Sequence, residues 1–125
     1  MLTIGVDIVA ISGMRETLER SGIIFTDRVF TVIEKEYSLK HPDRAVYYAE
    51  IFAAKEAVFK TFSTGWTENM SFLDIEIKKG INGEPLVGLK GEFLKKLIQK
   101  NARDIQISLS WEQDTVVAFA VMQPF

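Results

Sequence analysis

The sequence predicts a single α+β domain over residues 1–125, in which an antiparallel sheet packs on one long helix and several short helices. Three observations favour this fold class. Segments with a two-residue period lie near both ends, the stretch from Asp43 to Ser63 contains neither Gly nor Pro, and Asn82-Gly83 separates two short strand-like runs. Because hairpins replace a regular strand-helix-strand rhythm, we expect antiparallel pairing.

The first strand is expected where apolar residues alternate with small or polar ones, from Leu2 to Val9. Asp7 is the only acidic residue in this stretch. The two-residue period puts Asp7 on the same face as Gly5, opposite the face of Ile4 and Val6. An isolated carboxylate here has an ordinary explanation, as a helix-entry residue or as the solvated end of a sheet.

The remaining elements follow from periodicity and from residues that begin or end helices. Ser12 and Gly22 are cap signals for the first helix, Pro42 suits the first turn of the third, and Gly65 ends it. Helices are expected at 14–22, 32–39, 43–63 and 91–101, with a connector at 25–30, and further strands at 72–78, 86–89, 104–111 and 115–122.

Composition excludes several classes of function. A net charge of -2 and a pI near 5.4 provide no basic surface for nucleic acid. The absence of Cys excludes disulfides, thiolate zinc sites and a cysteine nucleophile. No basic leader precedes the first strand and no apolar run approaches about 18 residues, so we expect a soluble cytoplasmic protein without a membrane partner.

The long helix carries charges inside an apolar segment, FAAKEAVFK, at residues 52–60. At about 100° per residue, Glu56 lies about 40° from Phe52, within the apolar stripe, and Lys60 lies on its flank. The simplest hypothesis is an ordinary ion pair between Glu56 and Lys60, one turn apart. The alternative is that the Glu56 carboxylate needs a stronger compensating cation, either Lys60 or a metal, because it is partly removed from water.

Two further features of this helix bear on assembly and metal binding. Ile51, Val58 and Phe62 form a second apolar patch, so the helix is either central in its domain or shared with another subunit. Asp7 and Glu56 together would supply two oxygen donors from different elements. Such a pair suits Mg²⁺, which often takes one or two protein carboxylates and completes its shell with waters and substrate phosphates.

Several short motifs share their order with a known family. They are Gly5-Val6-Asp7, Phe25 to Thr31 followed by Glu34, Phe52 to Lys60, Thr64-Gly65, the run Gly83-x-Pro85-x-Val87-x-Leu89-x-Gly91, Ile107 to Ser110, and Ala118 to Val121. Together they cover nearly the whole chain. In this arrangement the sequence resembles the holo-(acyl-carrier-protein) synthase group of 4′-phosphopantetheinyl transferases.

The resemblance implies a fold, a reaction and a set of site residues. The implied enzyme moves the 4′-phosphopantetheine arm of coenzyme A to a serine of an apo acyl carrier protein and releases 3′,5′-ADP. Asp7 and Glu56 would hold Mg²⁺, Lys60 would contact the coenzyme A phosphates, and either Glu56 or a metal-bound water would accept the serine proton. The family also implies a homotrimer with active sites between subunits, which agrees with the two-sided helix.

Other positions are weaker candidates for binding coenzyme A. Lys55 is expected at the helix edge, where its ammonium reaches a neighbour or a phosphate. Gly65 either ends the helix or brings a loop backbone close to the coenzyme, and Ser110 belongs to a motif near it. Arg28 and Arg44 would hold phosphates or carrier-protein acids, unless they are solvated surface residues.

Three positions depart from the family pattern, each where a functional side chain is expected. Gly13 and Ile51 stand in place of arginines, and Trp111 stands in place of a histidine, although a Trp side chain is able to stack on adenine. These departures leave an alternative open: a non-catalytic trimeric homologue that binds coenzyme A or a nucleotide and has lost transferase activity.

Overall fold

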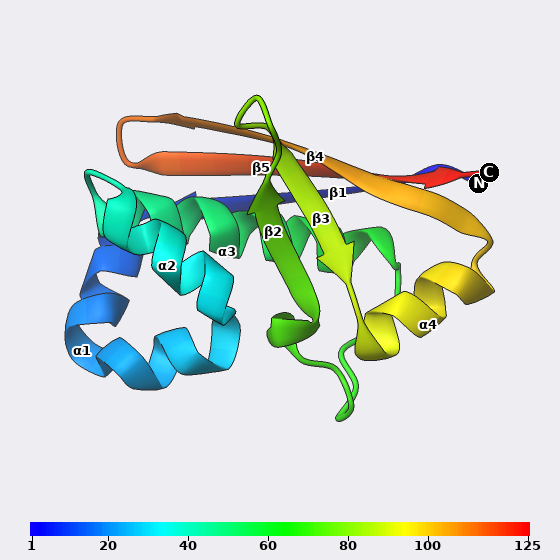
Figure 1. The fold of residues 1–125 in the computed structure, drawn as a ribbon, viewed down its shortest axis with the longest axis horizontal. Coiled ribbons are helices and arrows are strands. Elements are labelled where there is room, and N and C mark those ends of the chain that lie inside the picture. The colour runs from blue at the N-terminus through cyan, green and yellow to red at the C-terminus, as the bar shows by residue number, and fades with distance from the viewer.

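The computed structural model describes all residues, 1–125, and shows an α+β fold (Figure 1). The elements in chain order are β1 (Thr3–Ala10), α1 (Ile11–Val29), α2 (Val32–Lys40), α3 (Arg44–Thr61), a 3-10 turn (Phe72–Asp74), β2 (Ile75–Lys79), β3 (Pro85–Leu89), α4 (Gly91–Gln99), β4 (Ala102–Glu112) and β5 (Thr115–Pro124). This is the order of strands and helices that the sequence predicts. No helix is both long and apolar enough to cross a membrane.

The expected connector at 25–30 is wrong, because helix α1 continues through most of it. Gly22 does not end the helix but kinks it, with φ 46° and ψ −120°, and the chain resumes a helical path. Beyond the kink, Thr26 and Val29 are buried, and the Phe25 ring packs against those of Phe30 and Phe52. Contact with α3 thus stabilises a turn of helix that the cap signal alone would have ended.

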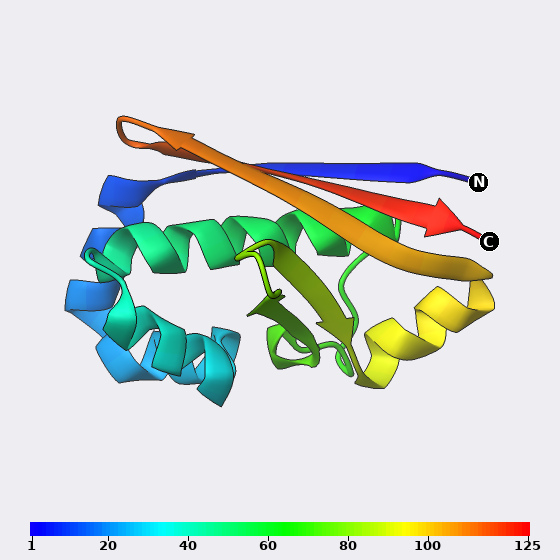
Figure 2. The same ribbon diagram turned by 45° about the horizontal axis from the view of Figure 1, so that its top comes forward.

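The strands form two separate antiparallel sheets. One has the order β1-β5-β4, and the other is the β2-β3 hairpin. Helix α3 runs beneath the three-stranded sheet, and the hairpin and α2 lie on its other side (Figures 1 and 2). The fold therefore has the helix as its middle layer.

The central position of α3 explains why it is apolar on two sides. Ala49, Ala53 and Ala57 recur every four residues along one side of it, and all are fully buried. Ile51 and Val58 are buried elsewhere on its surface by the same chain. The second apolar patch of this helix is therefore no evidence for another subunit.

Close approach of β1 to α3 depends on Gly5. A Cβ atom at this position would collide with the backbone carbonyl of Ala57. We therefore expect Gly5→Ala to lower the free energy of unfolding by about 1–3 kcal/mol or more, as overpacking does. Gly13→Ala is the matched control, because its Cβ would meet only the Ala10 side chain at 3.9 Å. Denaturant unfolding should give a lower midpoint concentration for Gly5→Ala than for Gly13→Ala, and equal midpoints would contradict the close packing of Gly5 against α3.

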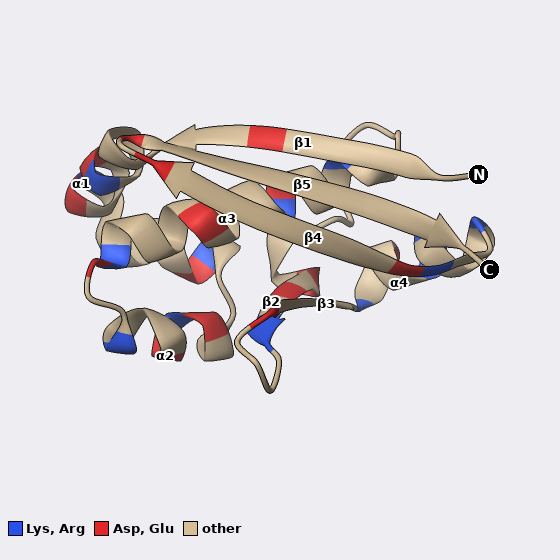
Figure 3. Cartoon of the chain, turned by 90° about the horizontal axis from the view of Figure 1, so that it is seen from above, with Lys and Arg blue, Asp and Glu red and all other residues tan.

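The strand β1 turns its apolar side away from the helix. Asp7 and Gly5 face α3, whereas Ile8 is 67% exposed and Phe119, on β5, is 50% exposed. We call this surface the outer sheet face; it consists of the register pairs Ile4 with Val121, Val6 with Phe119, and Ile8 with Val117. Figure 3, seen from above, shows these strands side by side with few charged positions along them.

Candidate active site

The structure brings Asp7, Glu56 and Lys60 together between β1 and α3. Because Gly5 lets the strand approach the helix closely, the Lys60 ammonium reaches the strand. Its Nζ atom donates to Asp7 Oδ1 and to the Val6 carbonyl oxygen, both at 3.0 Å. Asp7, which is far from α3 in the sequence, thus meets Lys60, and the charges of both act on Glu56 at the sheet-helix boundary.

The hypothesis of an ordinary ion pair between Glu56 and Lys60 is wrong. The Lys60 ammonium pairs with Asp7 instead, and Glu56 takes part in no ion pair. Partial burial raises the pKa of Glu56, the negative charge of Asp7 raises it further, and Lys60 only partly opposes these effects. One ammonium therefore faces two carboxylates but pairs with only one of them, which leaves the site short of positive charge.

This donor set fits a magnesium ion. The chain contains no group of three or more His, Cys, Asp or Glu residues able to hold a metal by themselves. A cation bound by Asp7 and Glu56 would therefore take its remaining ligands from water or from a substrate. Mg²⁺ commonly binds in this way and tolerates few protein ligands, and its charge would relieve the repulsion between the two carboxylates.

Lys55 is buried and not at the helix edge, and of its two expected partners, a neighbour or a phosphate, its ammonium contacts neighbours of the same chain. Its side chain is fully buried and forms a 2.7 Å ion pair with the equally buried Glu34. Burial raises the pKa of Glu34 and lowers that of Lys55. The positive charge of Lys55 partly lowers the pKa of Glu34 again, and the negative charge of Glu34 partly raises that of Lys55. Glu34 belongs to one of the motifs shared with the family and forms a capping box with Thr31, but neither signal identifies Lys55 as its partner.

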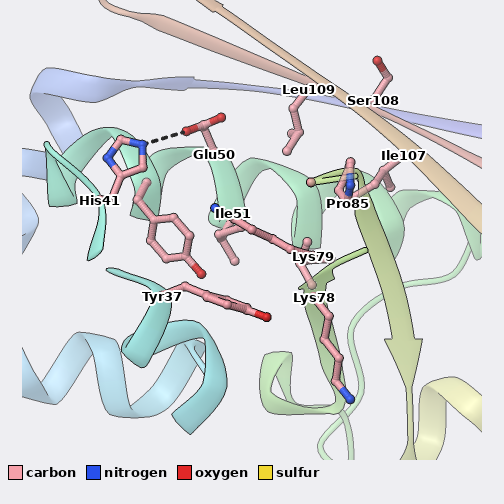
Figure 4. A pocket seen from close by; sticks show the side chains of 13 residues that line it. Tyr37, His41, Glu50, Ile51, Lys78, Lys79, Pro85, Ile107, Ser108 and Leu109 are labelled. Carbon is pink, nitrogen blue, oxygen red and sulfur yellow. Dashed lines mark ion pairs between the residues drawn. The ribbon is translucent and has the colours of Figure 1, made fainter. Parts of the chain in front are cut away.

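A cavity of about 400 Å³ lies on another side of α3 (Figure 4). Ile51 lines it together with Gly83, Pro85 and Ser108, so several motif positions meet here. Ile51 and Glu56 are separated by about 140° around the helix, at about 100° per residue. We call this space the Ile51 cavity; within one chain it is separate from the Asp7–Glu56–Lys60 group.

The charged side chains of the Ile51 cavity were not singled out from the sequence. Glu50 enters it from α3, with His41 Nε2 at 3.9 Å from its Oε1 atom (Figure 4). Two lysines also line the cavity: Lys78 forms an ion pair with Glu76 at 3.6 Å, and Lys79 lies 5.5 Å from the ring centroid of Tyr37. The cavity thus joins apolar walls to ammonium groups and a carboxylate.

Glu50→Gln is expected to stabilise the protein at neutral pH. Burial raises the pKa of Glu50, with His41 and Lys79 only partly opposing it. The folded state therefore favours the protonated carboxyl. Above the folded pKa, ionisation of Glu50 lowers the free energy of unfolding. Below the unfolded pKa of about 4.3 the carboxyl is protonated in both states, so this loss of stability is absent. Thermal melts should show the variant more stable near pH 7 and equal to wild type near pH 4. Equal stability at both pH values would contradict the prediction.

The other predicted coenzyme-binding residues do not join the Asp7–Glu56–Lys60 group. Arg44 is exposed at the opposite end of α3, where its guanidinium lies 5.7 Å from the Tyr48 ring centroid. Ser110 is exposed on β4 and lines, with Trp111, a shallow cavity near the β4-β5 turn. Gly65 lies in an exposed loop, with no atom within 4 Å of where its Cβ would be. Within one chain, only the loop of Gly65 follows closely on Lys60.

Comparison with known proteins explains the arrangement of these motifs. Residues 3–120 match the model of the 4′-phosphopantetheinyl transferase superfamily. The chain belongs to this superfamily. Its curated relatives include two proteins named holo-[acyl-carrier-protein] synthase: one from Desulforudis audaxviator, 39% identical over 97% of this chain and 92% of the relative, and one from Chlorobaculum parvum, 37% identical over 98% and 99%.

Solved structures of the superfamily share the fold. The holo-[acyl-carrier-protein] synthase of Neisseria meningitidis superposes with a TM-score of 0.86 and 32% identity, over 97% of both chains. The Helicobacter pylori synthase, solved in complex with coenzyme A, gives a TM-score of 0.84 and 29% identity, over 96% of this chain and 99% of that chain. The α+β transferase-like fold expected from the sequence is therefore confirmed.

Proposed function

We propose that this protein transfers the 4′-phosphopantetheine arm of coenzyme A to a serine of an apo acyl carrier protein and releases 3′,5′-ADP. The observation that carries the proposal is the meeting of Asp7, Glu56 and Lys60 at one point of the fold. Relatives similar over nearly the whole chain are named holo-[acyl-carrier-protein] synthase, and one was solved with coenzyme A.

The reaction attacks a phosphorus of the coenzyme pyrophosphate, where negative charge develops on oxygen atoms. In the proposal Asp7 and Glu56 hold Mg²⁺, which when bound neutralises part of that charge. Lys60 contributes a fixed ammonium, because the Val6 carbonyl and Asp7 already orient it before substrate arrives. Glu56 is the group of this chain that would accept the serine proton, through a carboxylate oxygen that is not bound to the cation.

The Ile51 cavity is proposed to receive the adenosine end of coenzyme A. Its volume of about 400 Å³, its apolar walls and its lysines suit a heterocycle attached to phosphate groups. Because the cavity and the Asp7–Glu56–Lys60 group face different sides of α3, one coenzyme molecule is proposed to bridge two copies of the chain. The exposed apolar outer sheet face supports such an assembly, which we take to be a homotrimer.

One observation favours a second candidate, a protein that binds coenzyme A without transferring its arm. The cavity carries the Glu50 carboxylate and the apolar Ile51, where the transferase pattern would place an arginine. A coenzyme phosphate entering this cavity meets a like charge, so coenzyme A held by other contacts would not take up the position that transfer needs.

Mass spectrometry distinguishes the two candidates. The purified protein is incubated with coenzyme A, Mg²⁺ and apo carrier proteins from its own organism, and the carrier is weighed. Transfer adds the mass of one phosphopantetheine arm to the carrier, and omission of Mg²⁺ should prevent it. Calorimetric binding of coenzyme A with no change in carrier mass would favour the non-catalytic candidate instead.

A further inference from the structure

The buried pair of Lys55 and Glu34 is hydrogen-bonded at all three ammonium donors and at both carboxylate oxygens. The three donors of the ammonium are all used: Val29 O at 2.6 Å, Phe72 O at 3.0 Å and Glu34 Oε1 at 2.7 Å. The carboxylate also accepts from the Thr31 backbone N–H at 2.8 Å. Its other oxygen accepts from the Ile77 backbone N–H at 2.7 Å.

These contacts join separate parts of the chain to one point on α3. Val29 ends α1 and Glu34 lies in the first turn of α2. Phe72 is in the returning part of the 62–74 loop, and Ile77 is in β2, which follows it. The loop leaves the end of α3 and comes back to it at Lys55, so both of its ends are fixed to the same helix. No other side chain connects all three segments to α3 in this way.

The same loop packs beside the helix face that carries Glu56. The Trp66 ring lies 5.2 Å from the ring of Phe59 and 4.8 Å from that of Phe72, measured between centroids. Phe59 lies about 60° from Glu56 around α3, at about 100° per residue. A displacement of the loop would therefore be felt next to Glu56.

Lys55 immediately precedes Glu56 on α3, so the hydrogen bonds of its ammonium also restrain the rotation of the helix beside Glu56. A rotation that moved the Glu56 carboxylate relative to β1 would stretch the bonds of the Lys55 ammonium to Val29 and Phe72. A buried ion pair is a poor source of net stability, since the desolvation of both charges offsets most of their attraction. Its directional bonds are better suited to fixing one arrangement.

We propose that the Lys55–Glu34 pair is a positioning device for the active site: it fixes the rotation of α3 and the return of the 62–74 loop, so that Glu56 faces Asp7. This inference rests on the proposed transferase function. In this proposal Lys55, the first lysine of the FAAKEAVFK segment, acts through its ion pair with Glu34 and does not contact the substrate.

Lys55→Met tests the inference, because it keeps the aliphatic stem and removes the ammonium. At a temperature where circular dichroism shows a fully folded variant, we expect kcat to fall by about 10- to 100-fold, as slight misplacement of reacting groups does, with little change in KM for the carrier. Acrylamide quenching of Trp66, measured in a Trp111→Phe background so that one tryptophan remains, should increase.

Tyr48→Phe is the matched control. It removes a buried hydrogen bond, from the Tyr48 hydroxyl to Ser38 Oγ at 2.9 Å, without touching Lys55. We expect lower thermal stability in this variant but unchanged kcat and unchanged quenching of Trp66. If Lys55→Met behaves like this control, with kcat and quenching as in wild type, the pair is only structural and the inference is overturned.

A second variant covers the case in which Lys55→Met does not fold. Glu34→Gln keeps a carbonyl oxygen for the Ile77 N–H and the size of the side chain, and the same decrease in kcat and increase in Trp66 quenching are expected. Wild-type values for both would overturn the inference. Because Trp66 quenching needs no transfer reaction, a failure of the inference and a failure of the proposed function give different results.

Discussion

Glu56→Gln is expected to lower kcat for arm transfer by about 10²–10³-fold, the size of effect seen when one preorganised charge-stabilising group is removed. The amide keeps the shape of the side chain but loses the charge that, with Asp7, would hold a divalent cation, and it cannot accept the serine proton. Single-turnover transfer to the apo carrier, followed by mass spectrometry, measures the loss. Calorimetric titration with Mg²⁺ and coenzyme A should show weaker metal-dependent binding.

The fold should survive this substitution. Burial and the charge of Asp7 both raise the pKa of Glu56, so a neutral side chain is at least as well accommodated as the carboxylate at neutral pH. Glu36→Gln is the matched control, since Glu36 is an exposed carboxylate of α2 without an ion pair. If Glu56→Gln transfers the arm at the wild-type rate, Glu56 has no catalytic role, even though the wild type is then an active transferase.

Helical periodicity placed Glu56 correctly among apolar neighbours but assigned Lys60 the wrong partner. A helical wheel reports which residues share a face, and the Glu56–Lys60 spacing is favourable for an ion pair. It contains no information about β1, whose Asp7 and Val6 carbonyl compete for the same ammonium and hold it. The donor types of Asp7 and Glu56 suit a shared Mg²⁺ site, and the family resemblance implies the same pairing, but neither gives the partner of Lys60.

The burial of Lys55 shows the same limit more strongly. On the wheel Lys55 lies at the edge of the apolar stripe, where a lysine usually extends into water. The end of α1 and the returning part of the 62–74 loop cover that edge, and Glu34 meets the lysine from α2. These contacts are set by tertiary packing, and no local pattern within α3 indicates them.

Phe119→Glu is expected to convert the proposed oligomer into monomers and to abolish transfer. Phe119 pairs with Val6 across the middle of the outer sheet face, and in the single chain it is 50% exposed. An aromatic residue at the centre of an interface commonly contributes about 2 kcal/mol or more to association, and a buried unpaired carboxylate opposes it further. Sedimentation or light scattering should show the monomer mass.

The loss of transfer would then follow from geometry, because Phe119 lies on the face of the sheet that points away from α3 and contacts neither Glu56 nor the Ile51 cavity. Gln99→Glu is the control: it adds the same charge at an exposed position of α4, away from the outer sheet face (Figure 1). If the wild type is itself a monomer that transfers the arm, one chain must supply the whole site. The coenzyme would then have to bind without reaching both sides of α3.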